Sequence, residues 1–270
     1  MGYPSRIICL TEETVETLYL LGREDLIVGV SEYVERPPEA KKLPQVSQFI
    51  RSDFAGIEAL KPDLVIGFSD LQKDIARELI GRGLNVLVTN QRSLSEILDQ
   101  ILFIGRLVGE ESKAQKLVSG FEAKIQAIQK EVQKLPKRPR VYFEEWDHPR
   151  LSGIGWVSEL IKLCGGENIF AHKSGSLAKD RAVSDEEILA LNPEIIFGCW
   201  CGKKVKIPSI KSRPSYEQIF AVQKDFIWEL PPEIFLQPGP ALFVDGLNQM
   251  FALIRQVALD LNPDAPIIKA

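Results

Sequence analysis

The stretch that most constrains this chain is residues 110–134, which contain no proline and a single glycine, Gly120. Its apolar residues recur at steps of three and four: Ala114, Leu117, Val118, Phe121, Ile125, Ile128 and Val132. That spacing places them on one stripe of an amphipathic helix about 36 Å long. Pro136 and Pro139 follow, and proline cannot continue a helix. One small lobe does not need so long a helix, so we predict a rigid spine with an α/β lobe on each side.

Short apolar segments alternate with helical patterns on both sides of this spine. Four segments before it are predicted strands: residues 7–10, 26–30, 63–68 and 85–89. After it, a strand is predicted at 140–143, a last strand at 226–230 and a final helix at 241–259. This alternation favours an α/β fold of two Rossmann-like lobes with parallel sheets, joined by one long spine helix. The N-terminal lobe, the linking helix and the C-terminal lobe are predicted at residues 1–109, 110–135 and 136–270.

A tandem repeat supports two lobes of one design. In residues 57–67 and again in residues 188–198, a helical segment is followed by a proline stop, an acidic residue and a buried strand. Chance explains this shared order poorly. Ligands in open parallel sheets bind outside the carboxyl ends of the strands. Two such lobes facing each other would place these ends around one cleft, so the residues that follow each strand are the candidate site.

Composition and charge argue against several classes of protein. Hydrophobic residues make up 45% of the chain, which is ample for a packed core. The net charge is −4, and no basic block or interleaving of aromatic and basic residues suggests nucleic acid as a partner. No apolar run approaches the roughly 20 residues of a membrane span, so no membrane insertion is expected.

The start of the chain and its cysteines predict where the protein works. Residues 1–5 lead straight into the first strand, which is too short for the apolar region of a signal peptide. Four cysteines are too few for a disulfide scaffold. We therefore expect a cytoplasmic protein, for which a role as an intracellular carrier or sensor is open, and a periplasmic or extracellular one only if a leader has been removed.

The most unusual segment at a predicted strand end contains Glu144, Glu145, Trp146, Asp147 and His148. One reading is a cleft-lining loop in which a glutamate or the histidine contacts a ligand or a metal. The other reading is a solvated loop in which one carboxylate caps a neighbouring helix. The position directly after a strand favours the ligand-binding reading.

A second cluster follows the predicted strand that ends the second copy of the repeat, residues 188–198. It contains Cys199, Trp200, Cys201 and Lys203. The two thiols are a candidate soft-metal site with His148 as a third ligand, and the neighbouring lysine favours thiolate. The alternative is one buried cysteine and one incidental cysteine. Trp200 is expected to line the cleft.

No catalytic motif is evident in the sequence. It contains no nucleophile elbow, no Ser-His-Asp spacing and no helix with two metal-binding histidines. A carboxylate pair such as Glu144 with Glu12 or Glu13 is suited to acid–base work, but nothing requires it, so we predict no enzyme and no covalent cofactor. The alternative is a cytosolic enzyme or cofactor-handling protein that uses the same cleft. Its candidate residues are Glu144, Glu145, His148, Cys199 and Cys201.

Three motifs carry a resemblance to a known family: residues 27–31 with Tyr33 and 36–38 behind them, residues 59–66, and residues 163–170. Over nearly the whole chain, the sequence resembles the class III substrate-binding proteins of ABC importers for vitamin B12, haem and ferric siderophores. The vitamin B12-binding members are the most similar. The resemblance implies two α/β lobes joined by one long helix, and a nearly rigid clamp with a small opening motion.

The resemblance also implies a ligand. Aromatic residues line the cleft of the vitamin B12-binding members, and the matching positions here are Tyr33, Phe49 and Phe68. Aromatic faces suit a flat macrocycle with a large apolar area, so cobalamin or another metal chelate is the expected ligand. The expected ligand-binding residues are Tyr33, Phe49, Phe68, Glu144, Glu145, Trp146, His148, Trp200 and Lys203, with Cys199 and Cys201 as metal-binding candidates.

The implied partner is the membrane subunit of an ABC importer. Family members that dock on this subunit place a surface glutamate on each lobe. The matching positions here are about Ala55 in the first lobe and Leu236 or Gln237 in the second, and none of these is acidic. The acidic residues near these positions are Asp53, Glu58 and Glu233.

Overall fold

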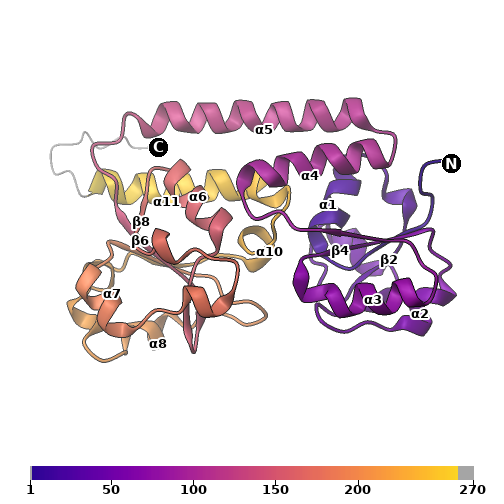
Figure 1. The fold of residues 1–270 in the computed structure, drawn as a ribbon. Coiled ribbons are helices and arrows are strands. Elements are labelled where there is room, and N and C mark those ends of the chain that lie inside the picture. Colours follow the sequence, from indigo (N-terminus) through magenta and orange to yellow (C-terminus); the bar gives the residue numbers. More distant parts are fainter. Residues whose placement is uncertain (1, 261–270) are drawn as a thin grey trace. The chain divides into compact units, whose positions relative to one another are not determined.

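The computed structural model describes residues 2–260, which form two compact units (Figure 1). Unit 1 comprises the described residues up to Gly120 together with Gln237–Ala241, and unit 2 comprises Phe121–Leu236 and the described residues from Leu242. Helix α5, Glu111–Val132, contributes residues to both units without a break. The predicted long helix is therefore confirmed, whereas the predicted three-part division of the chain stays a prediction.

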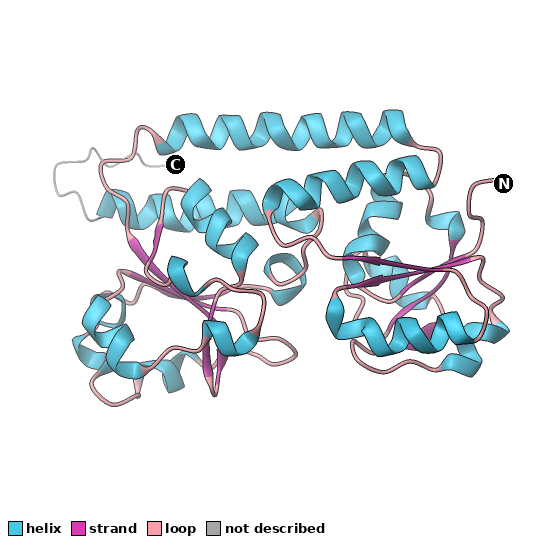
Figure 2. Ribbon diagram, viewed as in Figure 1, coloured by secondary structure: helices cyan, strands magenta, loops and turns pink. Residues whose placement is uncertain are grey.

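Unit 1 is built on a parallel sheet of five strands, with helices around it (Figure 2). The strands are β1 (Ile7–Cys9), β2 (Ile27–Ser31), β3 (Gln45–Ser47), β4 (Leu64–Phe68) and β5 (Val86–Thr89). The α-helices are α1 (Glu12–Leu20), α2 (Phe54–Ala59), α3 (Lys73–Gly81) and α4 (Leu94–Leu107), and the 3₁₀ helices are η1 (Glu24–Leu26), η2 (Pro38–Lys42) and η3 (Asp70–Gln72). The strand order is β3-β2-β1-β4-β5. The order reverses between β1 and β4, which is where ligands bind in sheets of this kind.

Helices cover both faces of this sheet because side chains alternate along each strand. Ile7 and Ile66 pack with residues of α1 and α4 on one face. Ile8 and Val65 pack with residues of α2 and α3 on the other face. All four side chains are fully buried. The central strands are therefore apolar on both faces, as expected for a parallel sheet.

Unit 2 contains a mixed sheet, whereas the sequence predicted parallel sheets throughout. Its strands are β6 (Arg140–Asp147), β7 (Arg150–Ser152), β8 (Glu167–Asn168), β9 (Ile195–Gly198) and β10 (Ile227–Glu229). The order is β10-β9-β6-β7, with β8 also paired to β6. The pairs β6–β8, β6–β9 and β9–β10 are parallel, but β7 is antiparallel to β6. Only two residues separate β6 from β7, and such a short connection permits a hairpin but no parallel crossover.

The helices of unit 2 include one irregular turn. The α-helices are α6 (Gly155–Leu163), α7 (Asp185–Leu191), α8 (Ile207–Lys211), α9 (Phe220–Gln223), α10 (Pro232–Phe235) and α11 (Leu247–Asp260). The 3₁₀ helices are η4 (Ala171–Lys173), η5 (Ala178–Arg181) and η6 (Tyr216–Gln218). The final helix begins with a π-helical turn, η7 (Leu242–Gly246), so the predicted regular helix at 241–259 starts later than expected. Lys124 Nζ donates to the carbonyl oxygens of Phe243 and Val244 at 2.6 Å each, which satisfies acceptors in this wide turn.

The tandem repeat folds as two equivalent α–β pairs, α2–β4 and α7–β9. In unit 1, Asp63 accepts hydrogen bonds from the backbone of Arg6, whose guanidinium donates to the carbonyl oxygens before Pro62. In unit 2, Glu194 accepts from the backbone of Arg140, whose guanidinium donates to the carbonyl before Pro193. The acid after each proline therefore joins two neighbouring strands at their amino ends. This shared contact explains why the acid recurs in both copies.

Candidate ligand-binding site

The predicted aromatic residues of unit 1 all lie at the carboxyl end of its sheet, but they differ in exposure. Tyr33 follows β2 and is 55% exposed. Phe49 follows β3 and is half-buried. Phe68 is the last residue of β4 and only 5% exposed, and the Arg92 guanidinium lies 5.0 Å from its ring centre. Tyr33 and Phe49 therefore offer accessible aromatic surface, whereas Arg92 and the core cover Phe68.

A buried glutamine holds two of these strand ends together. Gln72 Oε1 accepts a hydrogen bond from the backbone N–H of Phe68 at 2.9 Å, and its Nε2 donates to the Phe49 carbonyl at 2.9 Å. A Cβ atom at Gly67 would lie 2.7 Å from Gln72 Oε1, so glycine leaves room for this side chain. The sequence carried no signal for Gln72, which positions Phe49 and Phe68 through their backbones.

Two buried glutamates begin α1, and the first of them, Glu12, supports the loop that carries Tyr33. Glu12 Oε1 accepts hydrogen bonds from the backbone N–H groups of Glu35 (3.0 Å) and Arg36 (2.6 Å). Glu13 is 1% exposed and accepts a hydrogen bond from the Thr11 hydroxyl at 2.6 Å. Burial raises the pKa of Glu12 to about 8 and the pKa of Glu13 to about 7. These carboxyl groups have structural contacts rather than an open position facing a substrate.

The segment after Phe143 is not the loop that the sequence predicted. Strand β6 continues to Asp147 and pairs with β7, with Glu144 opposite Ser152 and Trp146 opposite Leu151. Successive side chains on a strand point to opposite faces. This alternation separates Glu144 from Glu145, whereas Trp146 packs beside the buried cluster that contains Tyr142 and Trp200. Because Glu144 is fully buried, these side chains do not form one exposed cluster.

Glu144 lies in a buried hydrogen-bond network within unit 2. Its carboxylate is fully buried and receives two hydrogen bonds from the Arg213 guanidinium, at 2.5 and 2.8 Å. The Tyr142 hydroxyl and Trp200 Nε1 each donate to it at 3.1 Å. The carboxylate of Glu144 raises the pKa of Arg213 despite burial. All these donors point inward, so the structure places Glu144 in the interior rather than on a cleft wall.

Trp200 and Glu145 are likewise held in the structure of unit 2. Trp200 is 2% exposed and packs in a hydrophobic cluster, although the sequence predicted a cleft-lining side chain. Glu145 forms an ion pair with Arg181, which is 5% exposed, and accepts a hydrogen bond from the Ile154 backbone at 3.1 Å. Burial raises the pKa of Glu145, and the Arg181 charge opposes that rise. The sequence carried no signal for Arg181 or Arg213, which pair with residues 36 and 69 positions away.

The accessible part of this sheet edge is formed by Trp146, Asp147 and Lys203, which we call the indole–lysine cluster. Lys203 Nζ lies 4.0 Å from the centre of the Trp146 ring and 2.5 Å from Asp147 Oδ1. Trp146 is half-buried, and its Nε1 donates to the carbonyl of the exposed His148 at 2.9 Å. Lys203 therefore covers one face of the Trp146 ring, and its charge is paired with Asp147. The accessible part of the indole and this ion pair are what the cluster offers to a macrocycle with polar substituents.

The two cysteines after β9 do not form a metal site in the structure. Cys199 is buried and Cys201 is exposed. No group of three or more His, Cys, Asp or Glu side chains within residues 2–260 could hold a metal ion. Burial and the nearby Glu145 carboxylate raise the pKa of both thiols, which disfavours the thiolate that the sequence predicts. Lys203 pairs with Asp147 and does not offset this effect.

Comparison with known proteins establishes the family. A family model described as periplasmic binding protein matches residues 7–234, which is most of the chain. The chain therefore belongs to the periplasmic binding protein family, a family of solute-binding proteins, and the resemblance drawn from the sequence is confirmed. None of the described helices has both the length and the apolar character needed to cross a membrane.

Individual relatives cover nearly all of the chain. An uncharacterized ABC transporter substrate-binding lipoprotein of Bacillus subtilis is 27% identical over 92% of this chain and 79% of its own length. The crystal structure of a possible iron-binding, periplasmic solute-binding protein of Staphylococcus epidermidis is 26% identical, with a TM-score of 0.80 and coverage of 94% and 99%. The crystal structure of the periplasmic vitamin B12-binding protein of Vibrio cholerae is 25% identical, with a TM-score of 0.76 and coverage of 94% and 98%.

The names of these relatives do not support the expected cytoplasmic location. One relative is named a lipoprotein and two structures are named periplasmic. The cytoplasmic expectation depended on the short segment before β1, and the start of a given sequence does not decide where a protein is exported.

Proposed function

We propose that this chain is the substrate-binding component of an ABC importer and that it binds a metal chelate, specifically a corrinoid. The observation that carries the proposal is the family match over residues 7–234. The vitamin B12-binding protein of Vibrio cholerae, which the chain matches over 94% of its length, supports the choice of ligand. The structure of this chain adds support through accessible aromatic side chains in each unit, Tyr33 and Phe49 in unit 1 and Trp146 in unit 2.

The side chains at these surfaces fit a corrinoid chemically. Tyr33 and Phe49 in unit 1 and Trp146 in unit 2 supply aromatic faces at the carboxyl ends of their sheets. Each aromatic contact with a flat ring contributes about 1 kcal/mol beyond its area burial. Lys203, which is paired with Asp147, lies over Trp146 and has further N–H donors for a polar substituent. The inter-lobe cleft expected from the sequence stays a prediction, because it concerns the placement of one unit relative to the other.

The alternative of an enzyme is less well supported by the residues that it requires. Glu144, Glu145 and Cys199 are engaged in structural contacts or buried, so they are poorly placed to meet a substrate. The non-enzymatic role remains a prediction, and it agrees with the solute-binding family.

The proposed partner is the membrane subunit of the importer. The acidic residues near the expected docking positions of unit 1 already have partners: Asp53 caps α2 through the Gly56 N–H, and Glu58 pairs with Arg82. Both remain at the surface, and in unit 2 Glu233 is half-buried. We propose that these three carboxylates take the place of the missing docking glutamates.

The test is to titrate the purified protein separately with cyanocobalamin, haem and a ferric hydroxamate siderophore. Tryptophan fluorescence measures the binding of each ligand. We expect saturable binding of the corrinoid, weakened several-fold by Trp146→Ala and by Tyr33→Ala. Tyr3→Ala is the matched control, because Tyr3 is 68% exposed but precedes β1 and lies at no carboxyl strand end. Binding of haem or siderophore alone would refute the corrinoid, and binding of none of the three would refute the metal-chelate function.

A further inference from the structure

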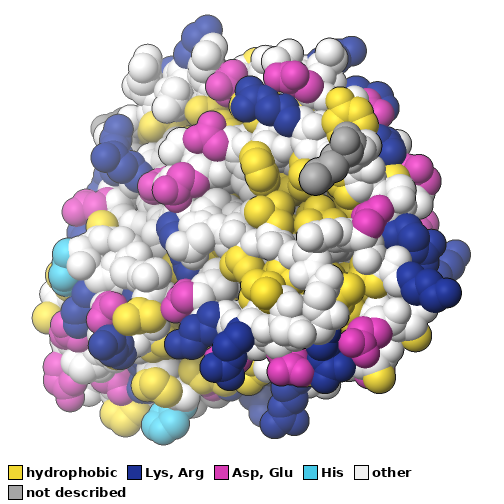
Figure 3. All heavy atoms as spheres, turned by 45° about the vertical axis from the view of Figure 1, so that its right-hand side comes forward, with side chains coloured by type: hydrophobic (Ala, Val, Ile, Leu, Met, Phe, Trp, Pro, Cys, Tyr) yellow, Lys and Arg dark blue, Asp and Glu magenta, His cyan; other side chains and the backbone are white. Residues whose placement is uncertain are grey.

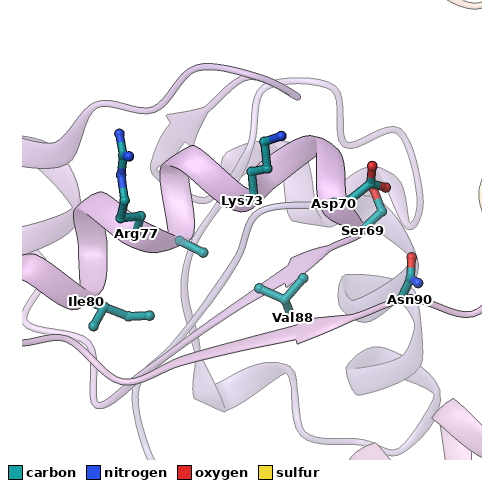
Figure 4. Close-up of a pocket in the computed structure, with 8 residues that line it drawn as sticks. Ser69, Asp70, Lys73, Arg77, Ile80, Val88 and Asn90 are labelled. Atoms are coloured by element: carbon teal, nitrogen blue, oxygen red, sulfur yellow. The ribbon is translucent and has the colours of Figure 1, made fainter.

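Unit 1 contains a hollow that none of the predicted ligand-binding residues lines. It has a volume of about 520 Å³ and lies between α3 and the strand β5 (Figure 4). We call it the edge groove, and its lining residues are Ser69, Asp70, Lys73, Ala76, Arg77, Ile80, Val88 and Asn90. Figure 4 shows Val88 rising from β5 toward α3, with Ile80 on the same side. Ile80 is 60% exposed and Val88 is 40% exposed, so the groove presents apolar surface to solvent.

The backbone of β5 is open along this groove. β5 is the last strand of its sheet, next to β4 alone. The carbonyl oxygens of Asn85 and Thr89 accept hydrogen bonds from Val65 and Ser69, on the β4 side. Backbone groups alternate in direction along a strand, so the N–H and C=O groups of Val86 and Val88 face the outer edge. Such an edge is a template for one more strand.

The rim of the groove is positively charged, although the whole chain carries a net charge of −4. Lys73 and Arg77 line the groove from α3, with their side chains directed away from β5 in Figure 4, and the Arg77 side chain is 84% exposed. The nearest carboxylate to Arg77 is Asp74, at 3.8 Å and 74% exposed, a pair that contributes little in water. Asp70 is paired with Arg92 at 3.2 Å, so its charge is already offset.

On the face of the molecule shown in Figure 3, Lys and Arg side chains are interspersed with Asp and Glu side chains. Around the groove the three cations Lys73, Arg77 and Arg92 exceed the two carboxylates Asp70 and Asp74 by one charge. We propose that the edge groove binds an extended acidic segment of a partner protein, which adds to β5 as a sixth strand. In this arrangement, alternate apolar side chains of the segment cover Ala76, Ile80 and Val88, and its carboxylates meet Lys73 and Arg77.

A second copy of this chain suits the groove less well. Pairing of two β5 edges would bring two cationic rims together, and like charges repel. An acidic partner gains from the same charges in both the rate and the specificity of association. Main-chain hydrogen bonds to the Val86 and Val88 edge supply the part of the affinity that does not depend on charge.

The test uses a fluorescently labelled peptide of about eight residues with alternating valine and glutamate, a length that spans β5 fully. We expect its anisotropy to rise on binding, and amide exchange at Val86 and Val88 to slow. A peptide of alternating valine and lysine tests the sign of the charge. A peptide of alternating proline and glutamate keeps the charge but cannot pair as a strand. Neither of these two peptides is expected to bind.

The protein variants separate the groove from general electrostatic attraction. Lys73→Glu and Arg77→Glu are each expected to weaken binding of the acidic peptide several-fold, since both side chains are exposed and the fold does not depend on them. Lys116→Glu, an exposed position on α5, is the matched control and should bind normally. Equal loss in the control, equal binding of the proline peptide, or a protein dimer that Arg77→Glu dissociates would each overturn the proposal. Binding of anionic lipid vesicles but not of the acidic peptide would also overturn it.

Discussion

At the scale of single residues, burial separates the two tryptophans that the sequence placed in one role. Trp146 is half-buried beside Lys203, whereas Trp200 is 2% exposed and donates to the buried Glu144. Neighbouring sequence could not distinguish them, because each tryptophan lies three residues after a phenylalanine of a predicted strand, Phe143 or Phe197. The buried position gives Trp200 a role in stability, whereas ligand binding by Trp146 stays a prediction.

Trp200→Ala should destabilise the protein, and Trp146→Ala should mainly weaken ligand binding. Replacing a buried tryptophan by alanine costs about 3–5 kcal/mol, because the cavity is not refilled. Chemical denaturation measures the first effect and fluorescence titration the second. Weak binding with normal stability in Trp200→Ala would contradict the buried position.

The ion pair of Glu144 with Arg213 yields a second prediction at this scale. Arg213→Met leaves a fully buried carboxylate without its cation, so we expect a loss of about 3–5 kcal/mol in the free energy of unfolding. The double variant Glu144→Gln with Arg213→Met removes both charges and should recover part of this loss. Denaturation of the two single variants and the double variant forms a complete cycle. Additive losses would show that the pair is not coupled.

At the scale of elements, the start of α1 makes stability depend on pH. The pKa values of Glu12 and Glu13 are raised from about 4.5 to about 8 and about 7 in the folded protein. At a pH between about 4.5 and about 8, the folded protein keeps protons that the unfolded chain has lost. The free energy of unfolding therefore falls as the pH rises. The buried position of the two carboxyl groups is the cause, since a charge in the interior loses its hydration.

We therefore expect the free energy of unfolding to fall from pH 5 to pH 8, by an amount that depends on these two residues. The double variant Glu12→Gln with Glu13→Gln should have a flatter profile, because the amide oxygens still accept the hydrogen bonds but do not titrate. Denaturation at a series of pH values measures the difference between the two profiles. An unchanged slope in the variant would mean that other groups cause the pH dependence.

The helix ends of the tandem repeat provide a further test at the scale of elements. Lys61 follows α2 with a φ of 48°, in the left-handed region that costs other residues more than glycine. Lys61→Gly should raise the free energy of unfolding by about 0.5–1 kcal/mol, while Lys61→Ala should bring no gain. Thermal melts of both variants measure this difference in stability. A loss in Lys61→Gly would show that the lysine side chain stabilises this turn.

At the scale of the whole molecule, the continuity of α5 is the main constraint on motion. The helix passes from unit 1 to unit 2 at Gly120 and Phe121 without interruption. Its hydrogen bonds resist bending at that point, unlike a loose linker. We expect the radius of gyration to change only slightly when ligand binds, as small-angle scattering measures it. A large ligand-dependent change would contradict this expectation.

Gly120 offers a matched pair of variants for this prediction. Gly120→Ala adds a Cβ with nothing within 4 Å, so it should stabilise α5 by up to about 1 kcal/mol and leave the scattering unchanged. Gly120→Pro removes a helical hydrogen bond and breaks the helix. It should enlarge the ligand-dependent change in radius of gyration. Equal scattering of the two variants, with and without ligand, would show that α5 does not limit the motion.

The sequence by itself determined the α/β class, the long helix and the repeated α–β unit. These features follow from local physics: the spacing of apolar residues, proline stops and the alternation of helices with strands. Ser93 and Ser184, each followed by a glutamate three residues later, form capping boxes that are also encoded locally. The family resemblance was visible for the same reason, since its motifs are contiguous.

Only the tertiary structure decided which candidate side chains are accessible. Glu144 and Trp200 lie 56 positions apart, and their contact, together with the Arg213 guanidinium, exists only after the strands have assembled. The same holds for Gln72, which joins the ends of β3 and β4, and for the edge of β5, which is open because no further strand pairs with it in unit 1 as described. A residue's burial depends on partners that are distant in sequence, so a pattern of neighbouring residues cannot report it.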